Sequence, residues 1–352
     1  MAATATAGTR AQDARDEQAT LFADPRFSAP GRPPLPVLQQ RGDTAFYELA
    51  GSRIATPGTG VMRGWLTVNP YVGCEMSCSY CYAPYAHGWL VDRLQAEGRI
   101  PEGPGLPLAF DRGIFVKAAA ESVTRAVARS PGWSLALGTA TDPYQPAERR
   151  FRLTRGVLEE LARLRGVTLS ITTKSPLVLR DLDLLERIAA RSRLTVHLSL
   201  ISTDRVLLRR IEPRSPTPER RLAALRALRQ RGIRAGIFAM PLLPGLTDGA
   251  EAIDALFAAA READACFVVA GGVRLSGVSW KRFLPVLREL RPDLVDAYRT
   301  VVRDRRSPKR EAYRRRLDER IRGARERHGF TGPVPWEYGA SPEPEPQQLA
   351  LL

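Results

Sequence analysis

The sequence predicts an α/β protein, a partial (β/α)6 TIM-type barrel with a C-terminal helical extension. From Trp65 onward, short apolar runs alternate with stretches of helical periodicity, which is the pattern of repeated βα units and a parallel sheet. A chain of 352 residues is long enough to bury one large barrel core. Six candidate strands with intervening helices favour a barrel that is open on one side over a doubly wound sheet.

Each candidate strand is a short apolar run bounded by polar or turn-forming residues. In chain order they are Trp65 to Val68, Ser134 to Leu137, Thr168 to Thr172, Leu194 to Leu200, Arg234 to Met240 and Cys266 to Ala270. Two of the predicted helices carry clear boundary signals. Thr217 to Glu219 provide an N-cap, a first-turn proline and a first-turn acid, and Gly232 ends that helix. Asp248 with Glu251 forms a start similar to a capping box for the next helix.

Composition divides the chain into four parts. Residues 1–41 begin Ala/Thr-rich, become proline-rich, and contain no apolar run long enough for a signal peptide or a membrane span. We therefore predict a disordered tail on a cytoplasmic protein with no membrane partner. Residues 42–279 form the core barrel with its lead-in segment. Residues 280–330 are helical and basic, and residues 331–352, which begin with a Pro- and Glu-rich stretch, form a flexible tail.

Three of the four cysteines lie within eight residues, at Cys74, Cys78 and Cys81. The spacing Cys-x3-Cys-x2-Cys lets one loop bring three thiolates to three corners of an iron-sulfur cube, because soft sulfur ligands suit iron-sulfur or zinc chemistry. Cys266 lies far away in an apolar run, and we interpret it as a small buried hydrophobic residue. The fourth iron then has no protein ligand, and an open coordination position distinguishes a catalytic metal centre from a structural one.

The cysteine triad, with Tyr80 directly before Cys81, resembles the signature of the radical S-adenosylmethionine (SAM) superfamily. Other metal centres fit this pattern less well. A structural zinc site would need His87 as its fourth ligand, with no second pair of ligands elsewhere. An electron-carrying ferredoxin would need a fourth cysteine close by. A nonenzymatic iron-sulfur binding protein is the alternative of another functional class.

Polar residues follow the predicted strands, at the end of a barrel where active sites lie. The cysteine loop follows the first strand, and the run from Gly138 to Glu148 follows the second. A rare lysine, Lys174, follows the third strand, and Ser199 and then Glu212 to Arg214 follow the fourth. Each loop alone is compatible with an ordinary turn, because Gly, Pro, Thr and Asp also make turns. Their collection at strand ends favours a binding site for a polar ligand.

The runs Gly-Thr-x-Thr-Asp-Pro-Tyr-Gln-Pro-x-Glu, Thr-Lys-Ser and Glu212-Pro213-Arg214 together resemble one branch of the superfamily, the proteins related to spore photoproduct lyase, over Leu66 to Gly272. The resemblance implies a 4Fe-4S cluster on the three cysteines and SAM at its free iron. It also implies reductive cleavage of SAM to methionine and a 5′-deoxyadenosyl radical, with an electron donor such as flavodoxin or ferredoxin. By position, the implied SAM contacts are Tyr80 near the adenine, Gly138 and Thr139 near the amino group, and Ser199 or Arg214 near the carboxylate, with Lys174 a further candidate.

One region departs from that branch. In spore photoproduct lyases a cysteine after the second strand is thought to return a hydrogen atom to the product radical, whereas Gly138 to Asp142 contain threonines and no cysteine. A threonine hydroxyl is a poor hydrogen donor compared with a thiol. Reversal of a thymine dimer is therefore not expected unless a tyrosine such as Tyr144 substitutes. Damaged DNA or another nucleic acid is one substrate class, and a small molecule, peptide or protein is the alternative.

The charge distribution favours nucleic acid. The formal net charge is +15, but arginine supplies nearly all of the positive charge, which can also arise from the base composition of the coding sequence. Residues 299–327 hold 13 Lys or Arg against 5 Asp or Glu, which is +8 and more than half of the excess. This stretch predicts a face that binds the phosphates of DNA. A solvated helix face with pairs such as Glu311 with Arg315 is the other interpretation.

Two short segments predict a protein partner. Gln348 to Leu352 and Gln18 to Phe22 resemble the pentapeptide by which bacterial repair proteins engage the sliding clamp, in which a glutamine contacts a pocket rim and bulky apolar side chains fill the pocket. We expect purified clamp to bind the intact chain. It should not bind a form that lacks Gln348 to Leu352 and carries Leu21→Ala and Phe22→Ala. Equal binding of the two forms in a titration would contradict this prediction.

Overall fold

The computed structural model describes residues 33–59, 62–100, 109–275, 277–304 and 306–332. Both clamp-like segments, Gln18 to Phe22 and Gln348 to Leu352, lie outside the described residues and stay predictions. Most of the two predicted tails also lies outside them. Among the described residues, no helix is both long and apolar enough to cross a membrane.

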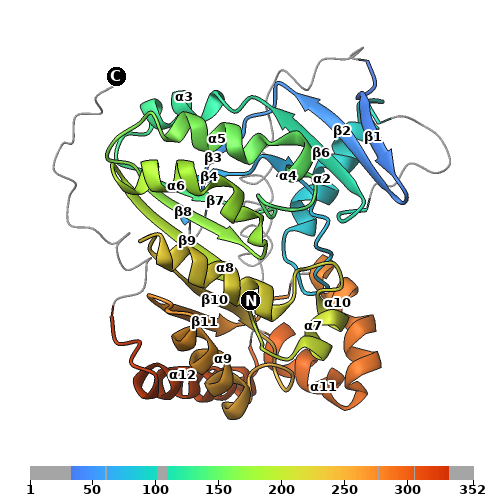
Figure 1. The fold of residues 1–352 in the computed structure, drawn as a ribbon. Helices are drawn as coiled ribbons and strands as arrows, with labels where there is room; N and C mark the ends of the chain where they lie inside the picture. The colour runs from blue at the N-terminus through green and yellow to red at the C-terminus, as the bar shows by residue number, and fades with distance from the viewer. Residues whose placement is uncertain (1–32, 60–61, 101–108, 276, 305, 333–352) are drawn as a thin grey trace, which may run out of the picture.

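The barrel is a sheet in the order β11-β10-β9-β8-β7-β4-β3 (Figure 1). Its strands are β3 Ala55–Pro57, β4 Trp65–Val68, β7 Ser134–Leu137, β8 Thr168–Thr173, β9 Arg193–Ser199, β10 Ala235–Leu242 and β11 Val268–Gly272. The six strands from β4 onward are parallel, and only β3 runs antiparallel to its neighbour β4. The predicted α/β fold and partial barrel are therefore confirmed. All six predicted strands are present, with boundaries that differ by at most two residues.

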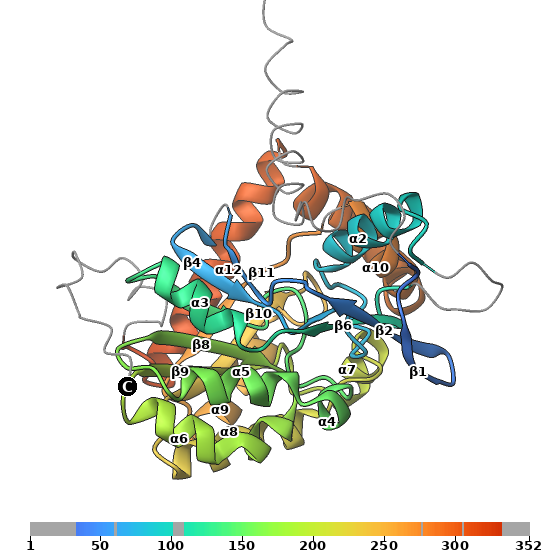
Figure 2. The same cartoon turned by 90° about the horizontal axis from the view of Figure 1, so that it is seen from above.

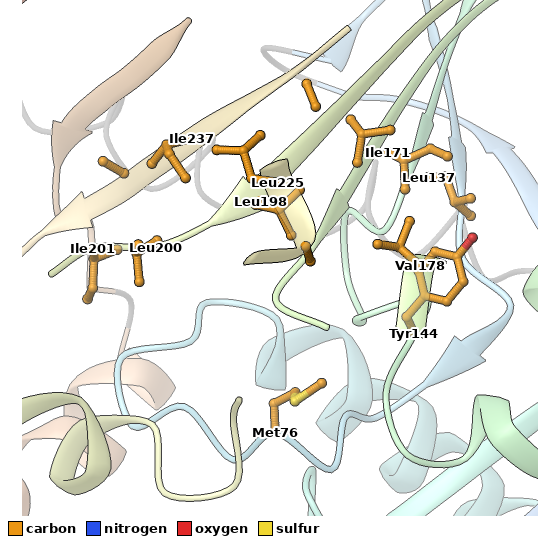
Figure 3. Close-up of a cluster of buried hydrophobic side chains, with 14 of the residues drawn as sticks. Met76, Leu137, Tyr144, Ile171, Val178, Leu198, Leu200, Ile201, Leu225 and Ile237 are labelled. Atoms are coloured by element: carbon orange, nitrogen blue, oxygen red, sulfur yellow. The ribbon is translucent and has the colours of Figure 1, made fainter. Parts of the chain in front are cut away.

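A row of register partners explains why these apolar runs pair as they do. The row crosses five adjacent strands, its members are at most 5% exposed, and it consists of Val68, Leu137, Ile171, Val196 and Ala235. Buried rows of this kind fix strand register, because a slip by one residue would turn each apolar side chain to the opposite face. Figure 3 shows part of this core, to which Met76 of the cysteine loop also belongs.

Helices cover the outer face of the barrel sheet. Figures 1 and 2 show α5, α6 and α8 together on one side of it. The helices are α2 Pro84–Ala96, α3 Ser122–Arg129, α4 Glu148–Phe151, α5 Leu153–Leu161, α6 Leu182–Ala189, α7 Arg205–Ile211, α8 Pro218–Gln230, α9 Ala250–Glu262, α10 Gly277–Leu290, α11 Val295–Tyr298 and α12 Pro308–Arg327. Shorter helical turns lie at Pro176–Asp181, Pro292–Leu294 and Arg299–Arg303. The boundary signals locate helix starts well, because α8 begins directly after Thr217 and α9 two residues after Asp248.

A second, four-stranded sheet was not predicted, and its strands come from before and between the first strands of the barrel sheet in sequence. Its order is β1-β2-β6-β5, from β1 Val37–Arg41, β2 Thr44–Ala50, β6 Gly113–Ala118 and β5 Tyr71–Val72. The prediction assigned residues 37–41 to a disordered tail, and here the structure differs. The segment Val-Leu-Gln-Gln-Arg lacks an alternating apolar pattern, so its strand depends on antiparallel pairing with β2 rather than on burial of its own side chains.

The basic C-terminal region is helical. Helix α12 buries Leu317, Ile321 and Ala324 and contacts both α9 and β11, so it covers the last strand of the barrel sheet. These three positions recur at spacings of four and three, which places them on one face of the helix. The expected pair between Glu311 and Arg315 does not form, although both residues are described. The arginines Arg314, Arg315 and Arg316 on the outer side of α12 are exposed.

Candidate metal and cofactor site

The cysteine loop begins where the first parallel barrel strand ends. Gly73, directly before Cys74, has φ +92°, and a Cβ there would lie 2.8 Å from the Gly113 carbonyl oxygen. Only glycine fits this close approach. The backbone amide of Cys74 then donates to the Phe110 carbonyl at 2.9 Å. The loop is therefore held against the start of β6 before its first cysteine.

The three cysteines of the loop are free thiols at a protected position. Cys74 and Cys78 are 8% and 7% exposed, and Cys81 is half-buried. Burial raises the pKa of all three thiols, and that of Cys78 to about 12. The thiols are therefore protonated at neutral pH in the metal-free chain. A metal ligand must be a thiolate, so metal binding at this loop would release protons.

The thiols do not form a site for one metal ion. Among the described residues, no group of three or more His, Cys, Asp or Glu side chains is arranged to hold a single ion. His87 is buried, and its Nε2 lies 2.8 Å from the Gly113 carbonyl oxygen, so it is engaged away from the thiols. Cys266 packs beside Phe267 and Val269 and is partly rather than fully buried. In a cluster each thiolate binds a different iron, so the three need not converge on one point.

A network of hydrogen bonds joins the cysteine loop to the loop after β7. The Glu75 amide donates to Gln145 Oε1 at 2.9 Å, and the Ala147 amide donates to Glu75 Oε2 at 2.6 Å. Gln145 Nε2 and Thr141 Oγ1 both donate to the Gly73 carbonyl, at 3.2 and 2.7 Å. Burial raises the pKa of Glu75, and the Ala147 amide and the Arg41 guanidinium oppose that rise. The motif that follows the second predicted strand therefore supports the cysteine loop directly.

Gly138 and Thr139 lie where the chain leaves β7. Gly138 has φ +92°, and a Cβ there would lie 2.5 Å from the Thr172 carbonyl oxygen, so this position also requires glycine. Thr139 Oγ1 accepts from Asn69 Nδ2 at 2.9 Å, and its carbonyl accepts from the Tyr82 hydroxyl. Asn69 also accepts from the Ala140 amide at 2.8 Å. Asn69 was not predicted as a site residue, although its position just after the first parallel strand was the available signal.

Four charged or polar side chains meet at the ends of β8 and β9. Lys174 Nζ donates to Ser199 Oγ at 2.8 Å and to Glu212 Oε1 at 3.2 Å. It lies 3.3 Å from the Tyr80 hydroxyl, which itself donates to Glu212. Three predicted site residues, Tyr80, Lys174 and Ser199, are thus brought together. The segment before α8 connects them through Glu212.

Glu212 is a buried carboxylate with two cationic partners. Arg221, which is 1% exposed, donates to Glu212 Oε2 at 2.5 Å and to the Ser199 carbonyl at 2.9 Å. Burial would raise the pKa of Glu212, but Lys174 and Arg221 outweigh burial and lower that pKa to about 2. Glu212 therefore stays ionised at neutral pH. The prediction named the segment that holds Glu212 but not its partner Arg221. In the sequence, Arg221 is one of two adjacent arginines near the start of α8.

Asp142 holds the loop after β7 against the loop after β8. Its carboxylate accepts from the Thr173 hydroxyl at 2.7 Å, the Lys174 amide at 2.8 Å and the Tyr144 amide at 2.9 Å. Burial raises the pKa of Asp142, and these donors lower it in part. The backbone of Lys174 is therefore fixed from the neighbouring strand.

Two predicted residues lie elsewhere. Arg214 reaches the N-terminal side of the site, where its guanidinium contacts the Asp111 carbonyl at 3.4 Å and Asp43 at 3.3 Å rather than the Lys174 group. Tyr144, considered as a hydrogen donor, is fully buried, and Figure 3 shows its ring beside Val178 in the hydrophobic core. Because Tyr144 is buried in the core, it is not positioned to contact a substrate.

Comparison with known protein families and curated proteins identifies one matching family and several relatives. The model of the Radical SAM superfamily matches residues 68–257. An uncharacterized protein of Mycobacterium tuberculosis is 36% identical over 269 residues, which cover 75% of each chain. An uncharacterized protein of Methanocaldococcus jannaschii is 31% identical over 181 residues, which cover 51% of this chain and 61% of the relative.

Solved structures of spore photoproduct lyase share the fold. One variant of that enzyme has a TM-score of 0.54 at 16% identity, and the match covers 76% of this chain and 74% of the lyase. A second, with bound AdoMet and dinucleoside spore photoproduct, has a TM-score of 0.52 at 17% identity with the same coverage. Identities this low establish the fold alone.

The Glu212 ion pairs generate a stability prediction. Glu212→Gln leaves Arg221 buried without its counter-charge, so we expect the free energy of unfolding at pH 7 to fall by about 3 kcal/mol. The folded-state pKa of about 2 lies below the usual 4.5, so wild type loses this contribution as pH falls from 4.5 towards 2. The difference in the free energy of unfolding between variant and wild type, measured by denaturant titration, should therefore shrink over that pH interval.

Glu319→Gln, on the exposed side of α12, is the control and should change the free energy of unfolding by less than about 0.5 kcal/mol. A loss that is equal at pH 7 and pH 3 would contradict the ion-pair explanation.

Proposed function

The chain belongs to the radical SAM superfamily, and we propose that its Cys74, Cys78 and Cys81 bind three irons of the superfamily's 4Fe-4S cluster. Membership makes the protein an enzyme with two cofactors, SAM and that cluster. The observation that carries the ligand proposal is the position of the three free thiols, on one protected loop at the carboxyl end of the first parallel strand. Three thiolates for four irons leave one coordination position for the amino acid end of SAM.

When bound, the reduced cluster and SAM would supply a 5′-deoxyadenosyl radical for hydrogen abstraction from the substrate. We propose that Lys174 and Ser199 bind the carboxylate of SAM, because they lie 2.8 Å apart and present a cation and a hydroxyl at adjacent strand ends. Glu212 orients both Lys174 and Tyr80 and holds them within hydrogen-bond range of each other. Arg214 is a weaker candidate, since its guanidinium is directed to Asp43 and Asp111.

The remaining SAM contacts are assigned to the cysteine loop and the start of the loop after β7. Gly138 and Thr139 would contact the amino group of SAM, because they lie where the chain leaves β7 and Asn69 fixes the Thr139 hydroxyl. Tyr80 would pack near the adenine. The burial of Cys74, Cys78 and Tyr80 limits the access of water to the reacting atoms, which a radical mechanism requires.

Cysteine substitutions test the proposed ligands. Cys74→Ala, Cys78→Ala and Cys81→Ala should each abolish the reducible cluster and lower 5′-deoxyadenosine formation to the level of a reaction without enzyme, since each removes one corner ligand. The measurements are iron and sulfide content after anaerobic reconstitution, visible absorbance, and 5′-deoxyadenosine by chromatography. Cys266→Ala is the matched control and should retain all three signals. If Cys266→Ala lost the cluster while Cys81→Ala retained it, the proposed set of three ligands would be wrong.

We propose nucleic acid as the substrate class. The support is the outer side of α12, where Arg314, Arg315 and Arg316 are exposed and have no ion-pair partner among the described residues. The spore photoproduct lyase that shares the fold has been solved with a dinucleoside spore photoproduct. The threonines in the loop after β7 argue for a reaction other than reversal of a thymine dimer, because a threonine hydroxyl does not replace a thiol as hydrogen donor.

Salt dependence tests the nucleic-acid proposal. Affinity for duplex DNA should fall steeply with added salt. The triple variant Arg314→Glu/Arg315→Glu/Arg316→Glu should reduce the slope of log affinity against log salt by about 3, because each phosphate that the protein no longer neutralises lowers the slope by about 0.9. Charge reversal at Arg165, Arg187 and Arg193, which are exposed on other parts of the barrel, is the control and should leave the slope unchanged. Wild type that fails to bind DNA at low salt would favour the alternative substrates, a small molecule, peptide or protein. Cleavage of SAM with and without damaged DNA then distinguishes these classes.

A further inference from the structure

A cavity of about 470 Å³ lies away from the cysteine loop, where the two sheets meet. Its walls come from the turn after β2, the two residues at and after the end of β6, and one face of α3. Strands β2 and β6 are parallel neighbours, with Ala50 paired to Ala118 at their carboxyl ends. Ligands of open α/β sheets bind outside the carboxyl ends of parallel strands, which is where this cavity lies. Its volume falls within the range of small-molecule sites.

The polar lining of the cavity is mainly cationic. Arg53, Arg125 and Arg129 line it against a single acidic residue, Glu121. Ser122, Arg125 and Arg129 follow one another at spacings of three and four along α3, so they lie on the same helix face. Arg125 and Arg129 are one turn apart. Two guanidinium groups at that spacing can contact one extended anionic group.

These arginines have no acidic partner in the described part of the chain. Arginine elsewhere in the structure is commonly paired, as in the contacts of Arg155 with Asp181 and of Arg221 with Glu212. Glu121, directly before α3, and Arg125 are four residues apart, yet no ion pair joins them. The cavity therefore gathers three cations and one carboxylate, and no ion pair among the described residues joins them.

A hydroxyl and an immobilised backbone segment complete the lining. Ser122 lines the cavity, and its hydroxyl oxygen is buried without a hydrogen-bond partner among the described residues. Lys117 donates to the Arg53 carbonyl at 3.1 Å and so fixes the backbone of the turn that carries the Arg53 guanidinium. Small residues provide the rest of the surface, among them Gly51, Ala55 and Ala126, and leave room for a ligand rather than filling the space.

We propose that this cavity binds a phosphate group carried by a nucleotide unit, with Arg125 and Arg129 as the main phosphate ligands. Guanidinium forks match phosphate geometry and can contact two phosphate oxygens at once. The nucleotide unit belongs either to a free nucleotide or to a nucleic-acid strand, and these two sources share the same phosphate chemistry. The site is separate from the cysteine loop, and the proposal holds whether or not nucleic acid is the substrate of the radical reaction.

The test uses the full-length reconstituted protein and three probes, a short fluorescent oligodeoxythymidylate, adenosine monophosphate and inorganic phosphate. Arg125→Gln/Arg129→Gln should weaken binding of a nucleotide probe at least about tenfold, because two charge-assisted hydrogen-bonding groups are removed. Arg125→Lys/Arg129→Lys keeps the charge and should retain part of the affinity. Arg165→Gln/Arg193→Gln removes the same charge at the opposite end of the barrel strands and should bind as wild type does. Thermal melts establish that each variant is folded.

The same variants are measured again in the Arg314→Glu/Arg315→Glu/Arg316→Glu background, so that strand binding by α12 cannot mask the cavity. Displacement of the fluorescent probe by adenosine monophosphate identifies a free nucleotide as the ligand, and salt-sensitive binding of the oligonucleotide alone identifies a strand. Both results support the proposal. Equal weakening in the control variant, or no binding of any probe to wild type, would overturn it. Formation of 5′-deoxyadenosine without substrate should be unchanged in the Arg125/Arg129 variants, so failure of the radical SAM assignment is detected separately.

Discussion

The buried carboxylate of Glu212 is the constraint on which the rest of the site depends. An ionised carboxylate without partners is costly to bury, so the structure surrounds it with Lys174, Arg221 and the Tyr80 hydroxyl. Each partner comes from a different element: the cysteine loop, the end of β8 and the second turn of α8. Satisfying one charge thus fixes three segments that are far apart in sequence at the carboxyl ends of β8 and β9.

The barrel was predictable because its signals are local. Apolar runs such as Leu194 to Leu200 are buried on both faces of a parallel sheet, so their composition alone identifies strands. The four-stranded sheet was not predictable, because β2 and β6 pair across more than sixty residues and β1 has mostly exposed polar side chains. Long-range pairing of this kind leaves no periodic pattern in the sequence.

The residues of the candidate site also fall into two groups, those that a local sequence pattern predicts and those that it does not. The cysteine spacing is a local pattern, and the conformation of Gly73 and Gly138 agrees with the requirement for glycine at close backbone approaches. Arg221 could not be predicted, because it lies in an arginine-rich helix where its neighbour Arg220 is exposed. Arg214 was chosen for its place beside Glu212 in sequence, yet successive residues after a turn point in different directions, and Arg214 reaches Asp43 instead.

The cysteine loop is held from both sides by groups that are not metal ligands. Glu75 forms hydrogen bonds with Gln145 and Ala147 of the loop after β7. The Ser77 hydroxyl donates to Asp111 at 2.5 Å, and the Ser79 amide donates to the Ile211 carbonyl at 2.9 Å. In small zinc domains the metal supplies the folding free energy, and the apo chain is unfolded. Here the loop is also joined to the rest of the protein by hydrogen bonds that involve none of its three thiols. Because these hydrogen bonds use backbone and non-cysteine side-chain groups, exchange of a cysteine side chain for a smaller one removes none of them.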